Sequence, residues 1–339
     1  MRRRHTIYFI VLGILLLVFF AGDLLLGSVG IPLKAVIGAL TGSGSDPQAS
    51  MLILNFRLPK AIVAVIVGAA LACSGLQMQT LFRNPLAGPY VLGVSSGASL
   101  GVALFLMGAP LLGGAFASET LRNIGIIGAA WIGAAGILFI IMAVSTRIKD
   151  IMAILILGIM FGSAATAIVQ ILQYMSSESA LKSFVVWTMG SLGGVLSSQL
   201  NIMVVAIASG LAISISLIKP LNLLLLGENY ARTMGLNIRA ARMLIFVSTV
   251  LLAGTVTAFC GPIGFIGIAV PHIARMLFAN ADHKVLMPAS ILIGCVLMLF
   301  CDIVAQLPGY EMVLPINTVT ALVGIPVVIA VIVRNKKVF

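Results

Sequence analysis

The hydrophobic pattern of this chain is dominated by long apolar runs that contain no charged residue. Four such runs cover residues 61–82, 123–146, 151–177 and 312–333. The hydrocarbon core of a bilayer is about 30 Å thick, so a helix rising 1.5 Å per residue needs about 20 apolar residues to cross it. Each run meets that length, and each therefore predicts a transmembrane helix.

Three further apolar regions are too long for a single crossing. We expect residues 84–118 and 183–218 each to hold one transmembrane helix plus irregular, glycine-rich connections. Residues 243–274 are interrupted at Gly261-Pro262, a dipeptide typical of turns. We therefore expect two helices in this region, joined by a tight turn on the outer side of the membrane.

Two more runs, residues 7–27 and 285–301, bring the predicted number of transmembrane helices to ten. The sequence thus predicts an all-α, polytopic membrane protein in which residues 1–339 form a single transmembrane domain. Glycines recur at spacings of three and four residues within these runs: Gly93, Gly97, Gly101, Gly133, Gly136, Gly158 and Gly162. Small residues at this spacing let helices pack closely in lipid, so they predict tight helix contacts rather than a binding site.

Composition excludes the soluble alternatives. Apolar residues make up 61 % of the chain and charged residues 9 %, against roughly half and a quarter in a typical soluble domain. A cytosolic enzyme or a secreted disulfide scaffold would need far more charge on its surface. The net charge of +11 is spread singly or in short clusters between apolar runs, so it predicts orientation in the membrane and not nucleic-acid binding.

The charges also predict which way the chain is oriented. With the N-terminus inside, fifteen of the 20 Lys and Arg residues fall on inner segments, and the outer five are Lys34, Arg57, Lys60, Arg122 and Lys182. The acidic residues divide the other way, with three inside and six outside: Asp23, Asp46, Glu119, Glu178, Asp302 and Glu311. This asymmetry follows the positive-inside rule, so we expect both termini in the cytoplasm.

The sequence lacks the groups that several kinds of membrane protein require. No predicted span has a charge at its centre, which disfavours an ion-coupled secondary transporter, although backbone carbonyls can also bind sodium. An integral-membrane enzyme acting on lipid-linked substrates would need clustered His, Asp or Glu, and these are scattered here. No Gly-Lys pair occurs, so a phosphate-binding loop is missing and any ATP hydrolysis must take place on another polypeptide.

Three blocks are more specific than generic membrane packing. The first runs from Arg57 to Gly101 and contains Arg57-Leu58-Pro59-Lys60 and the turn Asn84-Pro85-Leu86-Ala87-Gly88-Pro89. The second is the charged segment 219–242, which we expect to form two short helices flanking Met234-Gly235-Leu236. The third is GPIGFIGIAVPHIAR, residues 261–275.

In order and spacing these blocks resemble the FecCD-type permease subunits of iron-siderophore, haem and vitamin B12 ABC importers, which are type II importers. The resemblance covers about residues 50–330. It implies the type II permease fold, with ten helices in the bacterial inner membrane. It also implies three kinds of partner: a second permease copy, two cytoplasmic ATPase subunits, and a periplasmic or lipid-anchored substrate-binding protein. The chain itself would hold no cofactor, since ATP and Mg²⁺ would be bound by the ATPases.

The resemblance assigns Arg57 and Lys60 to docking of the binding protein at the outer mouth. The alternative is that both long side chains only anchor the helix at the membrane interface. The family usually has an Arg after Asp-x-x-Ala and a Glu-Leu-Pro-x-Gly motif before its last span. Here Gln306 takes the place of that Arg and Glu311 is displaced, which puts a third docking charge in doubt.

The resemblance also assigns a gate and a coupling segment on the cytoplasmic side. The gate would be Asn84, Pro85 and Leu86, although Asn84-Pro85 could equally be a simple helix stop. The coupling residues that would fit the ATPase are Gly227, Glu228, Ala231, Arg232, Met234, Gly235 and Leu236. A solvated loop is the alternative, but four successive leucines at 223–226 together with Met234 would then form an exposed apolar patch without a partner.

The function expected from sequence is inward movement of an iron complex, a ferric siderophore or haem, driven by the partner ATPases. Vitamin B12 import by the same machinery is the first alternative, and an ion-coupled secondary transporter is the second. We expect uncharged residues within 151–173 and 191–194 to line the path, because a large cargo must not bind tightly to it.

Overall fold

The computed structural model describes residues 2–27, 29–43, 46–108, 119–145, 147–148, 150–307 and 312–334. All regular elements in these ranges are helices, as the apolar runs predicted. Four of the charged residues that were counted to predict the orientation lie outside these ranges: Lys149, Glu311, Lys336 and Lys337. The chain divides into two compact units, residues 1–73, 191–205 and 263–339 forming the first, and residues 74–190 and 206–262 the second.

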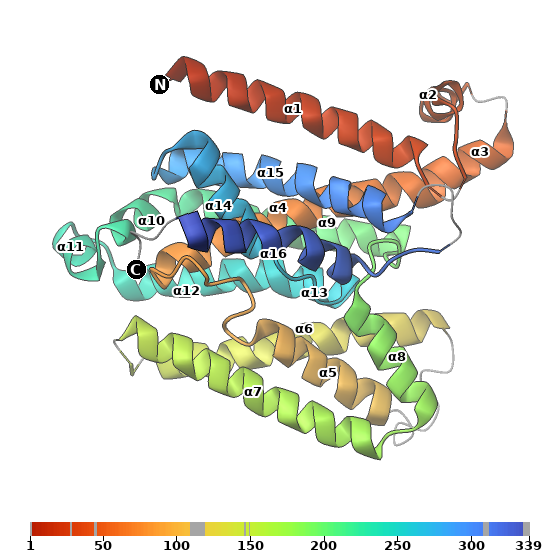
Figure 1. The fold of residues 1–339 in the computed structure, drawn as a ribbon. Coiled ribbons are helices and arrows are strands. Elements are labelled where there is room, and N and C mark those ends of the chain that lie inside the picture. Colours follow the sequence, from red (N-terminus) through yellow and green to blue (C-terminus); the bar gives the residue numbers. More distant parts are fainter. Residues whose placement is uncertain are drawn as a thin grey trace. The chain divides into compact units, whose positions relative to one another are not determined.

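The first unit is built around the N-terminal and C-terminal helices of the chain. In Figure 1, α1 lies along α15, and α14 packs on both α15 and α16. The helices of this unit are α1 (Arg2–Leu25), α2 (Leu33–Thr41), α3 (Pro47–Leu52), the π-helical turn η1 (Ile53–Arg57), α14 (Ile266–Phe278), α15 (His283–Ala305) and α16 (Ile316–Arg334). Most of α4 (Leu58–Leu81) and the first half of α9 (Ser197–Ser216) also belong to it.

The second unit has α5 packed between α6 and α7 (Figure 1). Its helices are α5 (Val94–Gly108), α6 (Glu119–Ser145), α7 (Ile151–Met175), α8 (Glu178–Met189), α10 (Ile218–Leu225), α11 (Glu228–Thr233), α12 (Ile238–Thr249), the π-helical turn η3 (Val250–Gly254) and α13 (Thr255–Cys260). Because α12, η3 and α13 follow one another without a break, residues 238–260 form one continuous helix.

Each of the ten predicted spans coincides with an apolar helix. Among the described residues seven helices are long and apolar enough to cross a membrane: Arg3–Leu25, Pro47–Leu81, Leu121–Ser145, Ile151–Met175, Ser197–Ser216, Ile238–Cys260 and His283–Ala305. The other three predictions fall on shorter apolar helices: Val94–Gly108, Ile266–Phe278 and Ile316–Ala330. Membrane crossing by these three, and the cytoplasmic location of both termini, stay predictions.

The helix boundaries confirm one predicted break and correct one predicted connection. Residues 261–265 interrupt the apolar region 243–274, as the Gly261-Pro262 dipeptide predicted. Residues 183–189 were expected to belong to a span or an irregular connection, but they form the end of a separate helix, α8. The local reason lies at its start, where the Ser177 side chain accepts a hydrogen bond from Ala180 N at 3.4 Å and Glu178 occupies the first turn. Both features stabilise a helix N-terminus.

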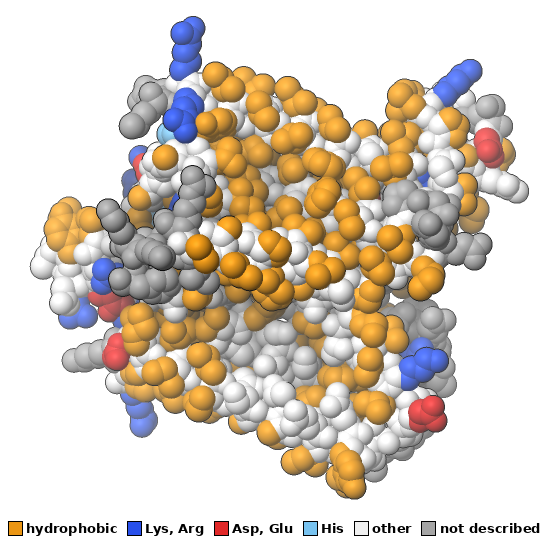
Figure 2. All heavy atoms as spheres, in the orientation of Figure 1, with side chains coloured by type: hydrophobic (Ala, Val, Ile, Leu, Met, Phe, Trp, Pro, Cys, Tyr) orange, Lys and Arg blue, Asp and Glu red, His pale blue; other side chains and the backbone are white. Residues whose placement is uncertain are grey.

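The most lipid-like surface of the first unit lies on α1. Ile10, Ile14 and Leu17 are between 55 and 71 % exposed, and apolar side chains cover this helix in Figure 2 with basic side chains at its N-terminal end. An apolar helix with its side chains exposed on most sides is stable only in lipid or against another apolar surface. By contrast, α4 is mostly buried within the protein.

Close backbone contacts explain most of the spaced glycines. A Cβ at Gly97 would lie 2.5 Å from Gly133 O, and one at Gly93 would lie 3.1 Å from Gly158 O. These contacts fix α5 against α6 and α7 and confirm the predicted packing role. For Gly136 the prediction is wrong, since nothing lies within 4 Å of its Cβ position.

A direct test of helix packing is available in the first unit, where Gly68 of α4 meets Gly294 of α15. A Cβ added at Gly68 would lie 2.6 Å from Gly294 C and 2.9 Å from Cys295 N, so Gly68→Ala must push two helix backbones apart. We expect a loss of about 1–3 kcal/mol in the free energy of unfolding, measured as a lower thermal midpoint in detergent. Gly13→Ala on α1 is the matched control, because its Cβ would have nothing within 4 Å. Equal midpoints for the two variants would contradict the packing argument.

Candidate functional site

Arg57, predicted to dock a partner, is directed into the first unit. It ends the π-helical turn η1 and is only 8 % exposed. Its Nη1 donates to Leu24 O at 2.8 Å and Leu25 O at 3.1 Å, and its Nη2 donates to Val29 O. The last carbonyls of a helix lack partners within the helix, and leaving them unpaired in a membrane is costly. Arg57 therefore caps the C-terminal end of α1.

Lys60 belongs to a second set of polar contacts beside Arg57. Its Nζ lies 3.0 Å from Asp302 Oδ1. Gln306 Nε2 donates to Asp302 Oδ2 at 3.0 Å and to Asp23 Oδ1 at 2.8 Å, and both aspartates are 2 % exposed. One amide thus joins carboxylates of α1 and α15, and a lysine of α4 neutralises one of them.

The two sets meet at Gly27 and form what we call the α1–α4–α15 polar cluster: Asp23, Arg57, Lys60, Asp302 and Gln306. A Cβ at Gly27 would lie 2.9 Å from Arg57 Nη2 and 3.1 Å from Gln306 Oε1. The cluster thus brings a lysine, an arginine and two aspartates together in one buried site. Sequence reasoning missed it, although Asp23 and Asp302 both stood near predicted outer span ends.

Contacts within the cluster limit how far Arg57 and Lys60 are available to dock a binding protein. Arg57 already has carbonyl partners inside the unit, whereas the Lys60 side chain keeps 21 % of its surface exposed. Docking of a binding protein through these residues stays a prediction, with Lys60 the more accessible of the two. Gln306, which replaces the usual Arg, has a structural role, because its amide joins the side chains of Asp23 and Asp302.

The predicted gate residues form a rigid turn after α4. Arg83 has a left-handed backbone with φ of 49°, Asn84 N donates to Gln79 O at 3.2 Å, and Arg83 N donates to Thr80 O at 3.3 Å. This pair of bonds is the Schellman ending of a helix. The Asn84 side chain then accepts from Leu86 N at 2.9 Å, and Leu86 is 38 % exposed. The helix α4 therefore ends before Asn84-Pro85, and a gating role for these residues stays a prediction.

The predicted coupling segment contains more helix than expected. We expected two short helices flanking Met234-Gly235-Leu236. The structure has two short helices, α10 and α11, both before this tripeptide, and the long α12 begins just after it at Ile238. Leu221 and Leu224 of α10 are buried, at 0 and 2 % exposed. These buried contacts explain why the apolar stretch 221–225 forms a packed helix rather than an extended loop.

Two glycines shape the coupling segment through backbone angles that favour glycine. Gly227 precedes α11 with φ of 102°, and Gly235 follows it with φ of 83°. After α11, Leu236 N donates to Ala231 O at 3.0 Å and Gly235 N donates to Arg232 O at 3.0 Å. Gly235 is therefore the left-handed residue of a second Schellman ending. Ala231 is fully buried beneath this turn, at 0 % exposed.

Glu228 holds the coupling segment in place. Its Oε1 lies 2.5 Å from Arg242 Nη2, which joins the start of α11 to α12. The Arg242 side chain is 7 % exposed and that of Glu228 24 %, so the pair is shielded on one side and screened less than a surface ion pair. Arg83 also approaches this segment, with its Nη1 3.6 Å from the Cβ position of Gly227. The predicted gate turn and coupling segment are thus neighbours within the second unit.

Several apolar side chains of the coupling segment are exposed on the surface of the protein. Leu226 is 62 % exposed, Met234 59 %, Tyr230 49 % and Leu225 38 %. A charged segment that leaves such side chains uncovered has the character of a protein-docking surface. We call these four residues the α10–α11 apolar surface. The sequence predicted a patch made of residues 223–226 and Met234. Met234 is indeed exposed, whereas Leu224 is buried and Tyr230 was not predicted to belong to the surface.

A hollow of about 440 Å³ lies between α5 and α7. Its lining carries no charge and includes Ser96, Ser163, Thr166 and Gln170. Five of its eleven lining residues bear a hydroxyl or amide group, and seven of the eleven lie within the stretch 151–173 that was expected to line a path. The other expected stretch, 191–194, lies by Lys60 in the first unit, where the Gly193 Cβ position is 3.9 Å from Lys60 Cδ. In the part of the chain that the structure describes, no three His, Cys, Asp or Glu side chains gather to hold a metal ion.

Comparison with known proteins finds a family match over nearly the whole chain. Residues 14–334 match the model of the FecCD transport family. The chain is 36 % identical over 336 residues to the vitamin B12 import system permease protein BtuC of Klebsiella pneumoniae, covering 99 % of this chain and 96 % of that one. It is 35 % identical over 329 residues to the hemin transport system permease protein HmuU of Yersinia pestis, covering 96 % and 94 %.

A solved structure shares the fold over almost its whole length. This is a metal-chelate type ABC transporter in an inward-facing conformation, with a TM-score of 0.82, 28 % sequence identity, and coverage of 98 % of this chain and 99 % of that one. Family model, relatives and structure agree over the same residues that hold the polar cluster, the turn after α4 and the coupling segment. The chain therefore belongs to the FecCD transport family.

Proposed function

We propose that this chain is the permease subunit of an ATP-driven importer that moves an iron complex, a ferric siderophore or haem, across the bacterial inner membrane. The family match over residues 14–334 and the two import permeases among the relatives support this role. Vitamin B12 is the alternative cargo, because the B12 and hemin permeases are almost equally similar to this chain.

The α10–α11 apolar surface is the observation that carries the proposal of a partner ATPase. Its side chains are exposed on a segment that glycine-dependent turns and the Glu228–Arg242 pair hold in a defined shape. A rigid surface can transmit a movement of the ATPase to the attached helices, whereas a flexible loop would change shape instead. We propose that two ATPase subunits, which bind ATP and Mg²⁺, act on this surface in an assembly of two permease copies.

The hollow between α5 and α7 is our candidate for part of the path. Its hydroxyl and amide groups can solvate a large cargo without the strong attraction that a fixed charge would exert. A binding protein outside the membrane would then supply the affinity and deliver the cargo. This division of labour explains why the permease needs no deep charged site.

Reconstituted vesicles test the energy source. With permease, ATPase and binding protein present, we expect uptake of the cargo to require ATP inside the ATPase-facing compartment and to persist when proton and sodium gradients are collapsed. Uptake that follows an ion gradient in vesicles lacking the ATPase would overturn the proposal in favour of a secondary transporter.

The cargo is tested separately with the same vesicles. Ferric siderophores, haem and cobalamin are offered in turn at equal concentration, each with the cognate binding protein, and uptake is measured by iron or cobalt content. Uptake of cobalamin alone would keep the importer and reject the iron complex.

A further inference from the structure

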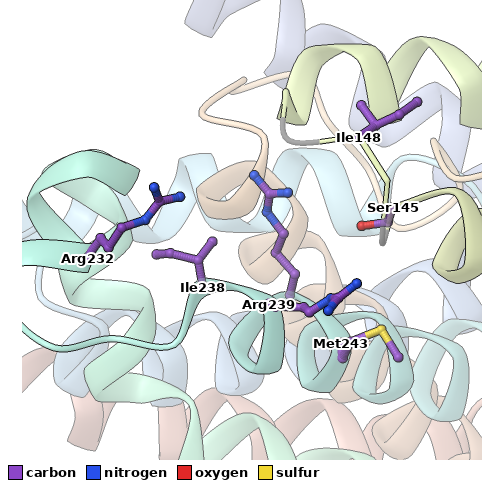
Figure 3. A pocket seen from close by; sticks show the side chains of 7 residues that line it. Ser145, Ile148, Arg232, Ile238, Arg239 and Met243 are labelled. Carbon is purple, nitrogen blue, oxygen red and sulfur yellow. The ribbon is translucent and has the colours of Figure 1, made fainter.

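A small cavity in the second unit lies where two long apolar helices end. It has a volume of about 140 Å³ and is lined by Ser145 at the end of α6, by Ile148, and by residues at the start of α12. Figure 3 shows Arg232 and Arg239 extending from the α11–α12 region, with Ser145 and Ile148 across from them. We call it the α6–α12 cavity.

Positive charge predominates around this cavity. Arg232, Arg239 and Arg242 line it, and no carboxylate is among its described lining residues. Arg242 is bonded to Glu228, which is itself not a lining residue. The cavity therefore favours an anion, and guanidinium groups match phosphate oxygens in particular.

The rest of the lining is apolar. Ile148, Ile238 and Met243 complete the wall, so a small, fully hydrated anion would leave part of the cavity poorly filled. An amphipathic molecule with a phosphate group attached to an apolar body fits both kinds of lining. This pairing of basic and apolar groups distinguishes the cavity from a general basic surface.

The expected position of the cavity in the membrane also suits a phosphate group attached to an apolar body. The helices Leu121–Ser145 and Ile238–Cys260 are both long and apolar enough to cross a membrane, and the cavity lies at the last residue of one and the first turn of the other. The ends of such helices lie at the polar interface of a bilayer, where lipid phosphates are found. Basic pockets between helices at this level bind anionic lipid headgroups.

We infer that the α6–α12 cavity binds the phosphate group of an anionic phospholipid. A free phosphate ion shares the headgroup's chemistry but not its apolar attachment, and an acidic segment of the ATPase is a different kind of partner. The lipid is favoured over the ATPase because the exposed apolar residues Leu226 and Met234 are not part of the cavity lining. The site is independent of the cargo, and it shares Arg232 with the predicted coupling segment.

The test measures lipid binding to the full chain purified in detergent. Phosphatidylglycerol and phosphatidylcholine are titrated in turn, and bound lipids are counted by native mass spectrometry. We expect phosphatidylglycerol to bind selectively and Arg239→Gln to weaken it about fivefold, since a basic residue near a lipid surface contributes about 1 kcal/mol. Arg232→Gln together with Arg239→Gln should weaken it by a further factor of about five, and Arg239→Lys should retain most of the affinity. Because Arg232 and Arg239 are exposed, these variants should fold.

Arg147→Gln is the matched control, since Arg147 is exposed and adjacent to Ile148 but does not line the cavity. We expect this variant to bind phosphatidylglycerol as the unaltered chain does. Equal weakening in the Arg147 and Arg239 variants would show diffuse surface attraction and overturn the inference. Displacement by millimolar inorganic phosphate would reject the lipid as the source of the phosphate group. Loss of the lipid when the ATPase subunit joins the complex would show that the cavity is an ATPase contact.

Discussion

Replacing Lys60 with Met is expected to lower the free energy of unfolding by about 3 kcal/mol, because it leaves the Asp302 carboxylate without its cation in a buried site. Asp302 is 2 % exposed, and the Gln306 amide that donates to it also donates to Asp23. Breaking a buried pair by removing one partner costs about 3–5 kcal/mol, and the partial exposure of Lys60 places the estimate at the lower end. The thermal midpoint of the purified chain in detergent measures the loss.

A second variant separates the charge from the packing. In Lys60→Met combined with Asp302→Leu, the carboxylate is removed together with the lysine. Replacing both members of a buried pair by apolar groups is often close to neutral, so we expect the double variant to recover most of the lost midpoint. Lys34→Met on α2 is the matched control, since Lys34 is exposed. A single Lys60 variant as stable as the Lys34 control would show that the polar cluster does not hold the helices together.

The same variants separate the two roles proposed for Lys60. If its charge docks the binding protein, then affinity at low salt falls in both the single and the double variant, because neither has the lysine. If Lys60 serves only the cluster, the double variant regains affinity together with stability. Charge reversal at Arg57 cannot make this distinction, since the Arg57 guanidinium caps α1 and its loss would also alter the fold.

Gly235→Val is expected to reduce ATP-driven uptake about tenfold while the complex still hydrolyses ATP. Gly235 has a φ of 83°, and nothing lies within 4 Å of its Cβ position. The loss of uptake would therefore come from strain in the backbone of residue 235 and not from a steric clash of the new side chain. A side chain in the left-handed region costs roughly 1–2 kcal/mol, and more for a β-branched residue. A shift of this size changes the population of the correct turn by a factor of about 5–30.

Gly235→Asn is the control, because asparagine tolerates the left-handed conformation far better than valine. It should keep most of the coupling, although it adds a side chain of similar size to the same open space. Uptake and ATP hydrolysis are measured on the same vesicles, so that their ratio reports coupling. If the valine variant transports normally, or the asparagine variant fails equally, the backbone of this turn does not set the coupling.

The coupling segment shows where prediction from sequence succeeds and where it ends. The Gly235 turn and its flanking helix could be predicted, since a glycine after a short helical pattern is a local signal. The division of the leucines could not, because α10 buries Leu224 and exposes Leu226 only through its packing. Glu228 was chosen as a coupling residue, yet its partner Arg242 is 14 residues away, and nothing local to either residue specifies the pair.

The α1–α4–α15 polar cluster makes the same point across the chain. Gln306 appeared in the sequence as a departure that removed a docking charge. The structure shows that it donates to Asp23, 283 residues earlier, and that Arg57 caps a helix about 30 residues before it. A single sequence gives no measure of which distant helix ends come together.

The sequence by itself determined the class of the protein, the positions of the described apolar helices that coincide with its predicted spans, and its family resemblance. It could do so because partition into lipid depends on the composition of about 20 consecutive residues, and because turns and helix ends have local signals. Only the tertiary structure decided which charges are paired, which apolar side chains stay exposed and where cavities form. These depend on contacts between helices far apart in the chain, and such contacts are set by packing as a whole and not by any one segment.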